Sequence, residues 1–125
     1  MNNLLDSLDH ITIITKNLDE TKKFYINILG MKINNNRPPF NFDGAWLDLN
    51  NRPVVHIIVK ENHHYSSDKP TLDHVAFRAK NIESIKKRLD QYNISYDEKI
   101  TPDNQVHQIF TIDPNGIKIE LSKLI

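Results

Sequence analysis

The feature that most constrains this chain is a phrase that it repeats. Residues 9–17 read DHITIITKN, and residues 73–81 read DHVAFRAKN. A shift of 64 positions (73 minus 9) places the first phrase on the second, and it holds without a gap through the lysine pairs at 22–23 and 86–87. Because this register accounts for half of the chain, the sequence predicts an internal duplication of one supersecondary unit.

Each half has the pattern of a βαβββ module. A short β-branched and apolar run precedes a helix with apolar side chains at helical spacing, and three strand-like runs follow. In the first half we expect these elements at 10–15, 17–30, 31–35, 45–49 and 54–60. In the second half we expect them at 74–79, 81–93, 94–100, 106–112 and 117–123. The sequence therefore predicts an α+β fold.

Local signals set the limits of these elements. Asn17 and Asn81 are suited to cap the two helices at their N-termini, and Gly30 and Asn93 are suited to end them. The polar, non-periodic segment between the halves is expected to be a linker, so His63 and His64 within it are expected to be loop residues rather than ligands. The predicted organisation is a single domain over 1–125, with module one at about 6–60, a linker at 61–71 and module two at about 72–125.

Composition excludes several classes of protein. Lys+Arg and Asp+Glu are balanced at 16 each, which argues against binding to nucleic acid or to an acidic membrane surface. The chain has no cysteine, so thiolate metal sites and disulfides are excluded. No signal peptide is evident, and no apolar run approaches the roughly 20 residues that a bilayer requires. A cytoplasmic protein is the simplest expectation.

The repeat also aligns four side chains that can bind a metal. It pairs His10 with His74, and it pairs His56 with Glu120. Alternate residues of a strand share a face, and by this rule each of the four lies opposite an apolar stripe. Approximate two-fold symmetry between the modules would bring the four toward one point. Such a site suits a divalent ion with nitrogen and oxygen ligands, namely Zn, Ni, Co, Mn or Fe.

Four stretches carry a resemblance to a known family: LDHITIITKNLDETKKFYINILGMK, GAWLDLNNRPVVHII, LDHVAFRAKNIES and HQIFTIDPNGIKIEL. With these stretches the chain resembles the vicinal oxygen chelate superfamily, the glyoxalase, bleomycin-resistance and extradiol-dioxygenase group. The resemblance implies a cupped mixed sheet around a divalent metal, with the helices on its outer face. It also implies a small-molecule substrate and a homodimer. Whether one chain builds the site or two chains share it stays open, as does any use of glutathione.

By motif position, His10, His74 and Glu120 match the usual ligands of this family. His56 stands where glyoxalase I enzymes commonly have glutamate, and a histidine cannot supply that carboxylate chemistry. The resemblance therefore implies that Glu120 acts as the catalytic base. The favoured reading is a glyoxalase-like, metal-dependent lyase or isomerase. The alternatives are a small Fe(II)-dependent extradiol-type dioxygenase and a small-molecule binding protein that confers antibiotic resistance.

Further side chains are candidates for binding the substrate. Arg37 could hold an anionic group, and Trp46 could stack on a ligand. His107 and Gln108 are adjacent on a predicted strand and so face opposite ways, which leaves open which of them reaches the cavity. The segment 113–116, Asp-Pro-Asn-Gly, is expected to be a turn that aims the last strand.

Overall fold

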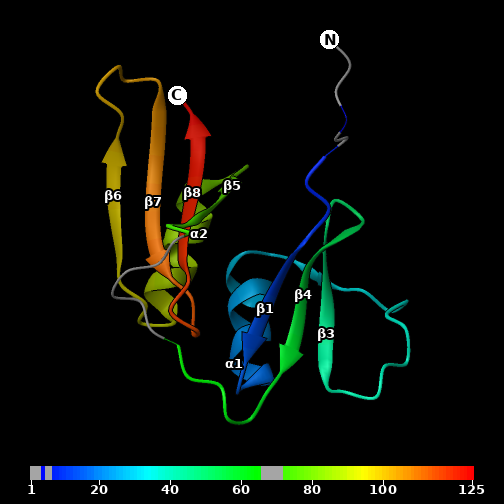
Figure 1. Ribbon diagram of the computed structural model, residues 1–125. Coiled ribbons are helices and arrows are strands. Elements are labelled where there is room, and N and C mark those ends of the chain that lie inside the picture. Colours follow the sequence, from blue (N-terminus) through cyan, green and yellow to red (C-terminus); the bar gives the residue numbers. More distant parts are fainter. Residues whose placement is uncertain (1–3, 5–6, 66–71) are drawn as a thin grey trace.

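The computed structural model describes residues 4, 7–65 and 72–125 (Figure 1). Residue 6, where the first module was predicted to begin, and residues 66–71 of the predicted linker lie outside the described residues. The first half contains β1 (Ile11–Thr15), α1 (Leu18–Lys22), η1 (Lys23–Ile28), β2 (Lys32–Ile33), β3 (Gly44–Leu49) and β4 (Arg52–Val59). The second half contains β5 (Val75–Arg78), α2 (Ile82–Gln91), β6 (Tyr96–Ile100), β7 (Val106–Ile112) and β8 (Lys118–Leu124).

The strands form two four-stranded sheets with the same topology. Their orders are β1-β4-β3-β2 and β5-β8-β7-β6, and in each sheet the outer pair β1–β4 or β5–β8 is parallel while the other pairs are antiparallel. The register repeats as well, since Thr12 pairs with His56 and Ala76 pairs with Glu120. Both pairs are related by the shift of 64. The predicted α+β fold of two βαβββ modules is confirmed.

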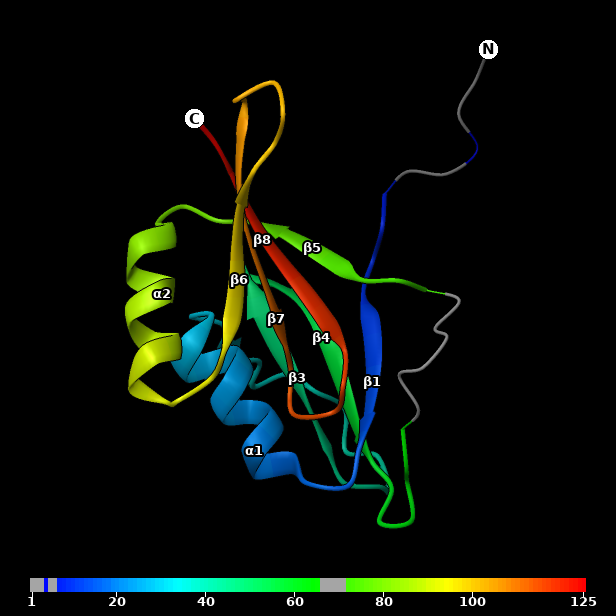
Figure 2. The same ribbon diagram turned by 90° about the vertical axis from the view of Figure 1, so that its left-hand side faces the viewer.

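The two faces of each sheet differ as the alternation predicted. Ile13, Val55 and Ile57 are almost fully buried in the first sheet, and Ile119 and Leu121 are equally buried in the second. Both helices lie on the same side of the strands (Figure 2), where these side chains join one core cluster with the apolar residues of α1, η1 and α2. The opposite face of each sheet is left for the candidate site. None of the helices in the described part of the chain is long and apolar enough to cross a membrane.

The ends of the helices follow their sequence signals. The side-chain oxygen of Asn17 accepts a hydrogen bond from the backbone N–H of Glu20, and Asn81 does the same for Ser84, both at 3.0 Å. Each bond satisfies an N–H group that the first helical turn leaves free. After the helices, Asn93 adopts a positive φ of 57°, a conformation that asparagine tolerates better than most residues.

One helix departs from the expected geometry. The predicted helix at 17–30 begins as α1 but continues as the π-helical segment η1, whose end is marked by a bond from the Leu29 N–H to the Phe24 carbonyl at 3.2 Å. Within this segment Phe24 and Tyr25 are adjacent in sequence, and both are buried. Apolar spacing over six residues cannot separate this geometry from an α-helix.

Candidate metal and substrate site

The four predicted ligands lie on the face of each sheet that is turned away from the helices. His10 immediately precedes β1. His56 lies on β4 and pairs with Thr12, which follows His10 by two residues and so shares its face of the sheet. His74 and Glu120 have the equivalent places on β5 and β8. The strands therefore bring together two pairs of side chains, one pair in each module.

The pair of the second module is joined by direct polar contacts. Nε2 of His74 lies 3.1 Å from Oε1 of Glu120, and the side-chain amide of Gln108 donates to Oε2 of Glu120 at 3.2 Å. The other ring nitrogen of His74, Nδ1, lies 2.7 Å from Oδ2 of Asp73. Only 12% of the Glu120 side chain is exposed. This carboxylate is therefore held in a defined position with its partners supplied by neighbouring strands.

The pair of the first module is held by ring stacking. The rings of His10 and His56 stack with their centroids 3.8 Å apart, and Trp46 stacks on the other side of His56 at 4.1 Å. Nδ1 of His10 lies 2.6 Å from Oδ2 of Asp9, whereas Nε2 of His56 lies 3.1 Å from the carbonyl oxygen of Pro53. The Nε2 atom of His56 is therefore engaged by the backbone of its own strand.

The titration of these groups follows their contacts. A hydrogen bond from His10 lowers the pKa of Asp9, and a hydrogen bond from His74 lowers the pKa of Asp73, to which the nearby Lys118 also contributes. Burial, reinforced by the neighbouring His10, lowers the pKa of His56. Both aspartates are thus favoured as carboxylates, and His56 is favoured as the neutral imidazole.

The donor set fits a divalent ion in part. Imidazole nitrogen and carboxylate oxygen suit Zn, Ni, Co, Mn or Fe, and His74 with Glu120 already places one donor of each kind side by side. Within the described residues, no group of three or more His, Cys, Asp or Glu side chains is placed to hold one ion. The described chain therefore presents two half-sites, His10 with His56 and His74 with Glu120, and not one converged centre.

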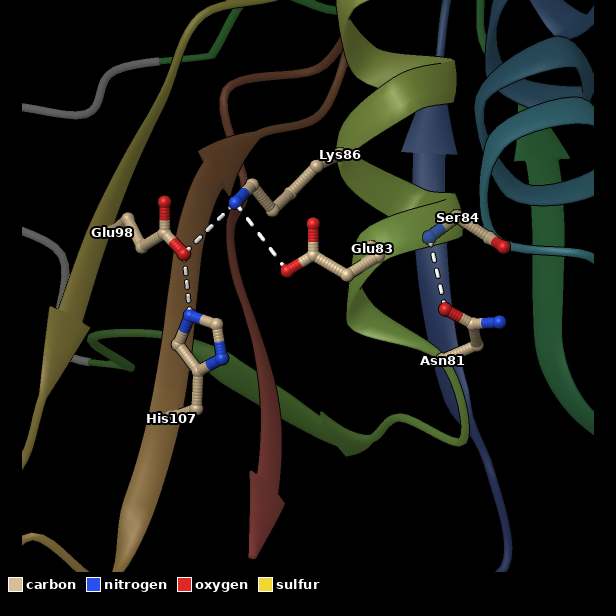
Figure 3. A network of polar contacts seen from close by, with 6 residues as sticks. All are labelled: Asn81, Glu83, Ser84, Lys86, Glu98 and His107. Carbon is tan, nitrogen blue, oxygen red and sulfur yellow. Dashed lines mark hydrogen bonds and ion pairs between the residues drawn. The ribbon is translucent and has the colours of Figure 1, made fainter. Parts of the chain in front are cut away.

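The predicted substrate residues divide between the two faces. Gln108 lies on the face of Glu120 and binds it, whereas His107 contacts Glu98 and lies on the helix side of the sheet, where Lys86 of α2 binds the same carboxylate (Figure 3). Figure 3 shows Lys86 and His107 meeting at the Glu98 carboxylate between α2 and the strands. Of these two adjacent residues, Gln108 is therefore the one that shares a face with Glu120.

Arg37 and Trp46 belong to an aromatic group beside the first half-site. The guanidinium of Arg37 lies over the rings of Phe40 and Phe42 and donates to the carbonyl of Phe42 at 2.9 Å. Phe40 in turn lies 6.3 Å from the ring of Trp46. Trp46 therefore contacts His56 directly, and Arg37 contacts the two phenylalanines of the group.

Sequence reasoning assigned no role to Asp9 and Asp73, although both are within the repeated phrase that revealed the histidines. The repeated Asp-His dipeptide was the signal that could have found them. A cavity of about 730 Å³ lies beside the second half-site, between strands of the two modules. Thr12 and Ile14 of β1 line it together with His74 and Lys118. The cavity has the size of a small-molecule site.

Comparison with known proteins identifies the family. The profile of the Glyoxalase/Bleomycin resistance protein/Dioxygenase superfamily matches residues 7–121. The chain belongs to this superfamily, in agreement with the duplicated βαβββ fold.

Individual relatives agree with this assignment. The chain is 28% identical over 123 residues to the protein named Glyoxylase I 4 of Arabidopsis thaliana, covering 94% of this chain and 70% of the relative. A solved glyoxalase family protein from Bacillus anthracis has a TM-score of 0.78 and 24% identity, with all of both chains covered. Another from Enterococcus faecalis has a TM-score of 0.74 and 25% identity, covering 96% of this chain and 99% of that one. The two structures support the fold.

Proposed function

We propose that this chain is a glyoxalase-like, metal-dependent lyase or isomerase whose small substrate carries two neighbouring oxygens. The observation that carries the proposal is the pair of equivalent half-sites on the face that the helices leave free. His74 and Glu120 are in contact there, and His10 with His56 has the equivalent place in the other module. A divalent ion with such ligands acts as a Lewis acid toward substrate oxygens and stabilises negative charge that develops on them.

Glu120 is the proposed base. Gln108 holds Oε2 by a hydrogen bond and thereby directs Oε1 toward His74. The carboxylate is mostly buried, so its position is set by these two neighbours rather than by solvent. His56 occupies the position at which a glutamate commonly serves in glyoxalase I, so the carboxylate chemistry falls to Glu120 alone. Arg37, Trp46 and Gln108 are the residues proposed to contact the substrate.

We further propose that the centre is completed between two copies of the chain. β1 and β5 are edge strands of their sheets, and each follows directly after a candidate histidine ligand. Leu8 and Leu72, which are equivalent in the repeat, are 78% and 73% exposed next to these histidines. Exposed apolar side chains beside unpaired strand edges favour association with a second copy. The His10 half-site of one copy would then meet the His74 half-site of the other.

One observation favours a second candidate function. The Pro53 carbonyl accepts from Nε2 of His56 and leaves that ring only Nδ1 as a donor atom, and a centre that does not use this Nδ1 is built from His10, His74 and Glu120. Two histidines and one carboxylate with open positions are the ligand set of non-haem Fe(II) oxygenases. A small extradiol-type dioxygenase is therefore the alternative.

The two enzymes are separated by activity measurements on protein loaded with single metals. The first proposal predicts turnover of the hemithioacetal of methylglyoxal and glutathione, or of a related 2-oxoaldehyde adduct, with no oxygen consumed. Glu120→Gln should lower turnover by about 10²–10⁴-fold, the usual contribution of a positioned base. Lys123→Ala, on the same strand but exposed, is the matched control.

The second proposal predicts that protein loaded with Fe(II) under anaerobic conditions, and no other form, consumes oxygen when a catechol is added. That result would support the dioxygenase and contradict the lyase or isomerase. A ligand that binds tightly and is recovered unchanged, with neither activity detected, would instead indicate the binding protein.

A further inference from the structure

The repeated phrase contains a polar contact that occurs once in each module. The carboxylate of Asp9 lies 2.6 Å from Nδ1 of His10, and the carboxylate of Asp73 lies 2.7 Å from Nδ1 of His74. The two contacts use the same atoms, Oδ2 and Nδ1, and join residues that are adjacent in sequence. Such agreement between modules that differ at most positions indicates that the contact is a property of the repeated unit.

Packing does not account for the two aspartates. The side chain of Asp9 is 84% exposed and that of Asp73 is 70% exposed, so neither fills space in the core. Apart from the histidine, the described contacts of the Asp73 carboxylate include only Lys118, whose Nζ lies 3.8 Å away. An exposed aspartate next to a strand is therefore held against one particular nitrogen of the following ring.

This contact determines which ring nitrogen carries the proton. An ionised carboxylate only accepts hydrogen bonds, and a neutral imidazole has one donor and one acceptor nitrogen. Nδ1 must then be the donor toward the aspartate, which leaves the lone pair on Nε2. In His74 that nitrogen faces Oε1 of Glu120 at 3.1 Å, so the two acceptors are satisfied by a proton in the metal-free protein and by a bound cation when metal is present.

We propose that Asp9 and Asp73 are positioning residues that fix the ring orientation of His10 and His74 and hold both rings in the Nδ1–H tautomer. The Nε2 atoms are thereby presented as ligands from the two half-sites. The part that concerns the metal rests on the proposed function, whereas the tautomer is a property of the metal-free protein and is tested separately.

The first measurement is long-range ¹H–¹⁵N NMR of the histidine rings in metal-free protein. It is made at about pH 8.5, well above the usual imidazole pKa of about 6.5. The wild type is expected to show Nδ1–H signals for His10 and His74. Asp9→Ala and Asp73→Ala are each expected to shift the adjacent ring toward Nε2–H, the tautomer that dominates in free histidine. Asp73→Asn keeps an acceptor oxygen and is expected to retain much of the wild-type signal.

The second measurement is calorimetric titration with Zn²⁺ or Co²⁺. Asp73→Ala is expected to weaken binding by about 10–100-fold, the usual effect of removing the partner of a ligating histidine. Asp97→Ala, which removes an exposed carboxylate on β6, should leave affinity unchanged.

Rings that keep the same tautomer in the alanine variants would overturn the inference, and so would wild-type rings in the Nε2–H form. A wild type that binds no metal but shows the expected tautomers would overturn the proposed function and leave the positioning role standing. Metal binding that is the same in the wild type and in Asp73→Ala would overturn the positioning role alone.

Discussion

At the scale of single residues, Tyr25 joins the two halves of the chain. Its side chain is fully buried, and its hydroxyl donates to Oδ2 of Asp113 at 2.8 Å across 88 positions of sequence. Asp113 also accepts from the backbone N–H groups of Asn115 and Ile117, each at 2.8 Å. Burial and the adjacent Asp113 carboxyl raise the pKa of Tyr25, so its hydroxyl stays protonated. The turn at 113–116 therefore shapes β7 and β8 and also anchors module two on module one.

Replacing Tyr25 by Phe tests this anchor. The change removes the hydroxyl and leaves the acceptors of Asp113 partly unsatisfied, so the free energy of unfolding should fall by about 1.5–3 kcal/mol. Urea denaturation measures the difference. The matched control is Tyr92→Phe, because the Tyr92 hydroxyl accepts a bond from Asn27 at the surface, and its effect should stay within about 0.5 kcal/mol. Equal effects of the two substitutions would contradict the anchoring role.

The sequence predicted part of the site at this scale. Strand alternation correctly placed His10, His56, His74 and Glu120 on the face opposite the apolar stripe. It could not predict that the Pro53 carbonyl would engage His56 or that Trp46 would stack on its ring. Such contacts depend on rotamers and on the local path of the backbone, which leave no mark in residue spacing.

At the scale of elements, the repeat was an accurate guide. It predicted the succession βαβββ in each half and both helix N-caps, because hydrophobic period and capping residues act locally. It did not predict the π-helical segment η1, nor that β2 would contain only Lys32–Ile33. The length of β2 is set by its pairing with β3, where Lys32 is opposite Asp48 and Ile33 is opposite Leu47. Such pairing joins residues distant in sequence.

The attachment of α2 to its sheet provides a prediction on pH. Lys86 and then His107 lower the pKa of Glu98 by hydrogen bonding to its carboxylate, as Figure 3 shows. Because the folded-state pKa of Glu98 lies below its unfolded value, this contact stabilises the fold above the ordinary Glu pKa of about 4.3 and is lost as pH falls through the lower folded value. Glu98→Gln should therefore be less stable than the wild type at about pH 7, with a smaller difference at about pH 3.5.

Denaturation at both pH values and low salt measures this difference, which should be modest because the pair is solvent-exposed. Glu83→Gln is the control, since Glu83 lies 3.5 Å from the same lysine but has no described contact with His107. A stability difference for Glu98→Gln that does not change with pH would contradict the assignment.

At the scale of the whole molecule, duplication predicted two equivalent modules but not how they are placed. That placement depends on contacts without a counterpart in the repeat, such as Tyr25 with Asp113 and Asn115 with Thr21. The repeat in the sequence carries no information about such contacts. It could therefore not predict whether symmetry would bring the four candidate ligands to one place. The structure instead describes two half-sites, which the proposed dimer would combine.

A mixing experiment tests the shared centre. One variant carries His10→Ala and His56→Ala, and the other carries His74→Ala and Glu120→Ala. If two copies share the site, hybrids of the two variants contain one intact centre, and the refolded mixture should bind metal that neither variant binds alone. Calorimetry and light scattering provide the readout. No recovered binding in a mixture shown to contain hybrid dimers would place the site within one chain.

In the proposed site, these histidines and Glu120 hold a divalent metal. The most direct test is elemental analysis of protein purified without chelator, comparing the wild type with His74→Ala and with His64→Ala, an exposed histidine of the linker. We expect a stoichiometric divalent ion in the wild type and in His64→Ala, and its loss from His74→Ala. A wild type without bound metal, or a His74→Ala variant with the full wild-type content, would contradict it.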